Sequence, residues 1–110
     1  MKLAAILVLL LAVALAAPAL SAAKPDATAG KAVFAKKCAA CHGSSGEGKE
    51  AIAKMLKVTM RDLGSKEVQA RTDDDIHKII REGNGKMKAV KEVSASDASN
   101  LIAFVRSLCK

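Results

Sequence analysis

The feature that most constrains this chain is the pentapeptide Cys38-Ala39-Ala40-Cys41-His42. Two cysteines separated by two residues and followed at once by a histidine form the attachment signal for a c-type haem. On one turn of helix, this spacing brings both sulfurs to one edge of a flat porphyrin and points the imidazole toward its iron. The motif therefore predicts one covalent haem c, attached through Cys38 and Cys41, with His42 as an iron ligand.

The same residues have three alternative interpretations. A thioredoxin-like disulfide between Cys38 and Cys41 is typically preceded by a strand in a βαβ unit, and no such pattern is visible. A zinc site needs further ligands at suitable spacing, whereas the other candidates, His77 and Cys109, are isolated. A chance pair of thiols in a packed helix is unusual in an exported protein. These comparisons favour haem attachment.

Segment 1–23 has the composition of a cleavable secretory signal peptide. A short basic start precedes an apolar run, Pro18 ends that run, and small residues allow cleavage after Ala22 or after Ala23. An uncleaved membrane anchor is the alternative, because about 20 apolar residues are enough to cross a bilayer. The segment predicts export to the periplasm, or to an equivalent extracytoplasmic or lumenal compartment.

Segment 24–110 has the length of a single small domain. The chain contains no Trp or Tyr and only two Phe, and its formal net charge is +7. A core so poor in large side chains is consistent with a buried porphyrin at its centre, although Ala-rich helix packing would explain it too. Export and the lack of aromatic stacking residues argue against nucleic-acid binding.

Hydrophobic spacing predicts an all-α domain, with helices over 29–38, 50–57, 72–83 and from about 94 to the C-terminus. Asp26 or Thr28 caps the first helix, and Ser94 or Ser96 with Asp97 caps the last. Thr72 begins the third predicted helix and Gly83 ends it. The Asn84-Gly85 pair then turns the chain and presents Met87.

The order of these features resembles a small monohaem class I cytochrome c. The matching positions, in chain order, are Gly30, Phe34, the 38–42 motif, Ile80, Gly83, Met87 and Phe104. The resemblance covers most of segment 24–110 and implies a class I cytochrome c fold wrapped around one haem. It also implies that Gly30 lets the first and last helices cross closely, with Phe34 and Phe104 packed near the crossing.

The chain departs from this family in three ways. Lys88, rather than proline, follows Met87. No proline follows the motif to accept a hydrogen bond from the ring nitrogen of the haem histidine. The Tyr and Trp that often bond a haem propionate are absent, which leaves Lys, Arg, Ser or backbone groups for that role.

Met87 is the predicted second axial ligand of the iron, opposite His42. Met60 lies in an irregular stretch and is the main rival, whereas Met55 is assigned to the apolar stripe of its short helix. His77 would give bis-histidine ligation, but its place at the edge of an apolar stripe is more typical of a solvated side chain.

With both axial positions filled, the iron has no room for a substrate, so the sequence predicts an exported electron carrier and not an enzyme. One alternative is a haem enzyme or gas-binding protein with an open sixth position, and another is a haem-free thiol or disulfide protein. The donor, the acceptor and the reduction potential do not follow from the sequence.

Lysines flank both the motif and Met87, at positions 36, 37, 86, 88 and 91. Around an exposed haem edge they would attract redox proteins with acidic docking surfaces, such as membrane oxidoreductases or terminal oxidases and reductases. Ordinary solubilising charge is the alternative, and only transient contact with the membrane is expected. The odd thiol, Cys109, is either a partly buried structural cysteine or the link in a disulfide-bonded dimer of an otherwise monomeric protein.

Overall fold

The computed structural model describes residues 24–110, and the predicted signal peptide lies outside the described residues. This part of the chain is helical and contains no strand, as the sequence predicts. Its helices are α1 (Ala27–Lys37), α2 (Ala39–His42), α3 (Glu50–Leu56), α4 (Lys66–Gln69), α5 (Asp73–Glu82) and α6 (Ala95–Ser107). Within residues 24–110, no helix has both the length and the apolar character needed to cross a membrane.

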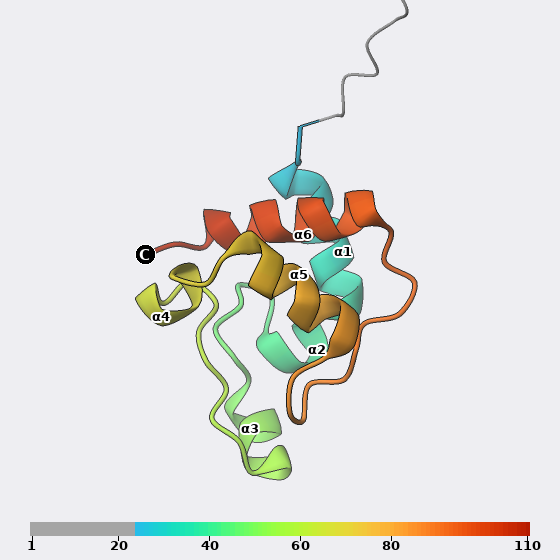
Figure 1. The fold of residues 1–110 in the computed structure, drawn as a ribbon. Helices are drawn as coiled ribbons and strands as arrows, with labels where there is room; N and C mark the ends of the chain where they lie inside the picture. The colour runs from blue at the N-terminus through green and yellow to red at the C-terminus, as the bar shows by residue number, and fades with distance from the viewer. Residues whose placement is uncertain (1–23) are drawn as a thin grey trace, which may run out of the picture.

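Helices α1 and α6 cross in close contact at Gly30 (Figure 1). A Cβ at Gly30 would overlap the backbone carbonyl of Asn100 in α6, so the crossing requires glycine. One helical turn further along α1, the ring of Phe34 packs against that of Phe104, with 5.0 Å between their centroids. Both rings are buried and, with Leu101, form the centre of the core. The predicted roles of Gly30, Phe34 and Phe104 are therefore confirmed.

Local capping signals fix where the longer helices begin. The Asp26 carboxylate accepts hydrogen bonds from the first turn of α1, and its own backbone N–H donates to Asn100 Oδ1 at 2.8 Å. Hydroxyl groups of Thr72 and Ser94 cap α5 and α6 in the same way. The three aspartates that follow Thr72 lie in the first turn of α5, where the helix dipole favours negative charge.

Arg106 of α6 ties the connection between α4 and α5 to the core. Its guanidinium donates to the carbonyl oxygens of Gln69 and Arg71, at 2.9 and 2.7 Å, and to the carboxylate of Asp73. The Gln69 side chain in turn donates to the carbonyl of Leu63 and, across to α6, to that of Val105. These bonds satisfy backbone carbonyls in the connection before α5, and they hold the 69–73 segment in place.

The structure contradicts the sequence expectation for Met55 and decides two points that the sequence left open. The assignment of Met55 to a buried stripe is wrong: its side chain is 68% exposed, because the short helix α3 stands apart from α6 and the core (Figure 1). The stretch before α5 contains a single helical turn, α4, which Ser65 caps and which buries Val68. Cys109 is exposed, so of its two expected states the partly buried structural cysteine is wrong.

Candidate functional site

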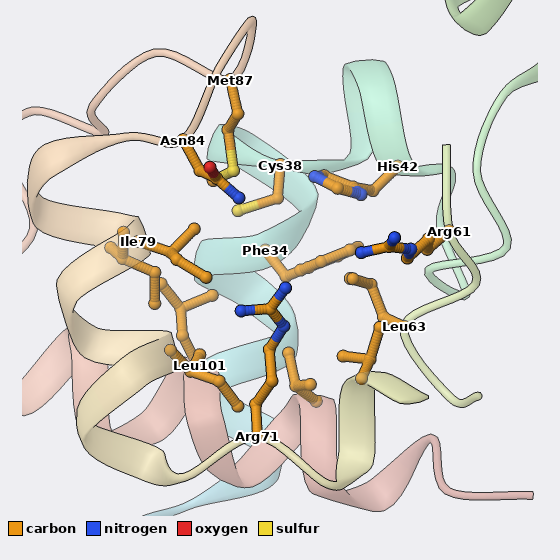
Figure 2. A pocket seen from close by; sticks show the side chains of 14 residues that line it. Phe34, Cys38, His42, Arg61, Leu63, Arg71, Ile79, Asn84, Met87 and Leu101 are labelled. Carbon is orange, nitrogen blue, oxygen red and sulfur yellow. The ribbon is translucent and has the colours of Figure 1, made fainter. Parts of the chain in front are cut away.

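A cavity of about 170 Å³, open to solvent, lies between α1, α5 and α6 (Figure 2). Half of its lining residues are aliphatic: three isoleucines of α5 together with Leu63, Val68, Leu101 and Val105. Cofactor sites typically combine apolar walls with a few well-placed polar groups. The polar and sulfur-bearing residues of this cavity are Cys38, His42, Arg61, Arg71, Asn84 and Met87.

The two cysteines of the motif sit at the junction of α1 and α2. Cys38 separates the two helices, is half-buried and lines the cavity, whereas Cys41 is exposed and is not part of the wall. Burial, with a smaller contribution from the nearby Cys41 thiol, raises the pKa of Cys38 to about 11. The Cys38 thiol is therefore protonated at neutral pH in the chain as it stands.

His42 ends α2 and faces the same cavity. Burial lowers the pKa of its imidazole, which favours the neutral form that binds metals. Its ring lies 6.4 Å from that of Phe34, and its Nδ1 is buried without a hydrogen-bond partner among residues 24–110. The backbone of His42 is held by the Gly48 N–H, which donates to the His42 carbonyl.

Met87 reaches the cavity from a tight turn after α5. Asn84 and Met87 exchange two backbone hydrogen bonds of 2.9 Å around Gly85, whose positive φ suits the first position of a two-residue turn. The Val90 N–H donates to the Ile80 carbonyl at 2.8 Å and ties the following segment to α5. Figure 2 shows Met87 and His42 on either side of Cys38, with their side chains directed into the cavity.

The rival ligand candidates do not line the cavity. Met60 packs its side chain beside Gly48, Met55 is exposed on α3, and the half-buried His77 lies on α5 outside the cavity wall. Among the methionines of residues 24–110, Met87 alone is part of the wall.

Two arginines in the wall are residues that the sequence analysis did not single out. Arg61 lies two residues before the half-buried Leu63 and pairs with Glu67 at 3.1 Å. Arg71 lies in the connection between α4 and α5, and its side chain extends into the cavity (Figure 2). Neither belongs to a periodic segment, so only their placement in the folded chain reveals them.

Known proteins resemble this chain in sequence and in fold. Residues 25–105 match the family model described as cytochrome c oxidase, cbb3-type, subunit III. The chain belongs to this family of c-type cytochromes. A solved structure named KustC0563 c-type cytochrome has 27% sequence identity and a TM-score of 0.60, over 74% of this chain and 98% of that one. No curated protein matches the sequence.

The fold of this c-type cytochrome is the class I cytochrome c fold. Membership of the family implies covalently bound haem iron, and the residues that line the cavity suit such a group. The cavity offers a half-buried thiol, a neutral imidazole and a thioether against aliphatic walls. A histidine binds a metal through one ring nitrogen, which leaves the other nitrogen of His42 free to hydrogen bond. Its buried Nδ1 has no acceptor among residues 24–110, although such an acceptor usually orients a ligating histidine.

Proposed function

We propose that this c-type cytochrome is an exported carrier of single electrons, with one haem held by Cys38 and Cys41 and axial ligation by His42 and Met87. The observation that carries the proposal is that His42 and Met87, which come from different elements, line one cavity together with Cys38. When bound, the haem supplies a one-electron iron couple, whose potential depends on its ligands and surroundings. Membership of the family fits electron transfer better than catalysis.

The protein side chains tune such a centre in three ways. His42 presents a neutral nitrogen, and Met87 presents a thioether, which raises the reduction potential relative to a second histidine. The aliphatic wall from α5 and α6 lowers the local dielectric and keeps water from the centre. Occupation of both axial positions leaves no coordination site for oxygen, peroxide or a substrate.

We also propose that the protein acts outside the cytoplasm and meets partners with acidic docking surfaces. Cytochromes of this kind are typically extracytoplasmic, and segment 1–23 has a signal-peptide composition. Lys86 and Lys88 are exposed on either side of Met87, and Lys37 is exposed just before the motif. Positive charge at the entrance to a redox site attracts acidic proteins and favours brief encounters.

The test is an absorption spectrum of protein produced with the c-type maturation machinery, recorded oxidised and reduced, with the mass of the intact chain. The proposal predicts a covalent haem, low-spin bands and a weak red sulfur-to-iron band. Met87→Ala should abolish that red band and allow carbon monoxide to bind, whereas the matched change Met60→Ala should leave both unchanged. If the haem spectrum of Met87→Ala matches that of the wild type, the proposed ligation by Met87 is wrong. If the wild-type protein is colourless, the proposed function is wrong.

A further inference from the structure

The cavity wall contains two arginines and no acidic side chain. Their surroundings differ, because Arg61 pairs with Glu67 whereas the guanidinium of Arg71 has no hydrogen bond or ion pair to any residue of 24–110. Arg71 is half-buried and extends past aliphatic side chains of α5 and α6 (Figure 2). An anion beside a half-buried guanidinium stabilises it, so the site suits a negatively charged partner.

Hydrogen bonds from Arg106 of α6 hold the backbone around Arg71 in place. Arg106 donates to the Arg71 carbonyl at 2.7 Å and to the Gln69 carbonyl at 2.9 Å, and its Nε donates to Asp73 at 3.1 Å. The segment that carries Arg71 is thereby bonded on both sides to α6. Because the backbone of Arg71 is held in this way, its side chain enters the cavity in a defined direction.

The chemistry of a c-type haem supplies the missing anion. Its two thioether bonds are made on neighbouring pyrroles, and its two propionate carboxylates hang from the remaining two, on the opposite half of the ring. In Figure 2 Cys38 lies at one end of the cavity and the Arg71 side chain enters from the other end. A planar guanidinium matches a carboxylate in a two-point hydrogen-bonded pair.

We infer that Arg71 binds a haem propionate, and that Arg106 is a positioning residue that holds Arg71 for this contact. The inference rests on the proposed binding of haem in this cavity. Arg71 takes the place of the tyrosine and tryptophan donors that this sequence lacks. Arg61 is the weaker candidate for the same role, because Glu67 already shares its charge.

The test compares three variants of the haem-loaded protein: Arg71→Gln, Arg71→Lys and Arg81→Gln. Arg81 is a matched control, since it is 70% exposed on α5, lies outside the cavity wall and carries the same charge. A cation near the centre opposes the extra positive charge of ferric iron, so its loss favours the oxidised state. Arg71→Gln should shift the oxidised-to-reduced equilibrium by roughly ten-fold, which is about 59 mV for a one-electron couple, and Arg81→Gln by much less.

A second readout detects the contact itself. The propionate bending band in the resonance Raman spectrum should shift from its wild-type frequency in Arg71→Gln. It should lie close to the wild-type frequency in Arg71→Lys and should be unchanged in Arg81→Gln. Arg106→Lys, which removes the bond to the Arg71 carbonyl, should move the same band in the same direction as Arg71→Gln. A merely structural role for Arg71 would lower thermal stability and leave the Raman band where it is.

The outcomes separate this inference from the proposed function. If the wild-type protein carries covalent low-spin haem but the Raman band and the potential of Arg71→Gln match those of Arg81→Gln, Arg71 does not bind a propionate. If the wild-type protein carries no covalent haem, the proposed function itself is wrong, and the inference falls with it.

Discussion

Gly83 and Met87 are in such close contact that a Cβ on the glycine would lie 2.6 Å from the carbonyl oxygen of the methionine. The same Cβ would lie 2.8 Å from the backbone nitrogen of Ala89. Gly83 also has a φ of +82°, which favours glycine. The end of α5 therefore sets the position of the turn that carries Met87, and a glycine outside the cavity wall controls a proposed iron ligand.

Gly83→Ala should displace Met87 and weaken its bond to the haem iron. The backbone strain alone is worth about 1–3 kcal/mol, and the collision with the Met87 turn adds to it. We expect a weaker red sulfur-to-iron band, a lower reduction potential and a lower midpoint of thermal unfolding. Gly85→Ala is the matched control, because Gly85 also has a positive φ but has open space around it. Equal losses of the red band in both variants would contradict a role for the contact.

The C-terminus supplies a prediction about acid stability. The Lys110 ammonium hydrogen bonds to Asp62 and holds the pKa of that carboxyl below its usual value, with help from the Gly64 N–H. A carboxyl whose pKa is lower in the folded state stabilises the fold above its unfolded pKa, and this contribution disappears as the pH falls through the folded pKa. Asp62→Asn should therefore lower the unfolding midpoint at neutral pH, and the difference from wild type should shrink below about pH 4.

Lys110→Gln provides the control for that experiment. Because both substitutions break the same ion pair, the double variant should be less destabilised than the sum of the two single effects. If the two single effects on the unfolding midpoint simply add at neutral pH, Asp62 does not act through Lys110. The same conclusion follows if the difference in midpoint between Asp62→Asn and wild type grows as the pH falls.

Local signals in the sequence were enough to predict much of this architecture. The haem motif requires only five consecutive residues, and the caps at Thr72 and Ser94 act within one helical turn. The motif and the caps depend on neighbours along the chain, so a single sequence is enough to reveal them. The crossing of α1 and α6 at Gly30 joins distant segments, and it was expected from the resemblance to class I cytochromes c.

The features that escaped prediction depend on contacts between distant segments. Met55 has the same helical spacing as a core residue, and only the position of α3 away from the other helices leaves it exposed. Arg71 has no periodic pattern around it, and it lines the cavity because Arg106, far along the chain, holds its backbone. Cys41 and Cys38 look equivalent in the motif, yet the break between α1 and α2 leaves one exposed and the other in the wall.

The lysines beside Met87 lead to a prediction about how electrons reach the site. Lys86 and Lys88 are exposed on the Met87 turn, so their charge acts where a redox partner would approach. Replacing both by Glu should slow oxidation of the reduced protein by the anion ferricyanide roughly ten-fold at low salt, and raised salt should remove most of the difference. The same variant should react faster with the cation hexaammineruthenium, because the sign of the interaction is reversed. Replacement of Lys31 and Lys66, which are exposed on α1 and α4, makes the same change in net charge. If that pair slows the ferricyanide reaction as much, total charge rather than a local rim governs the encounter.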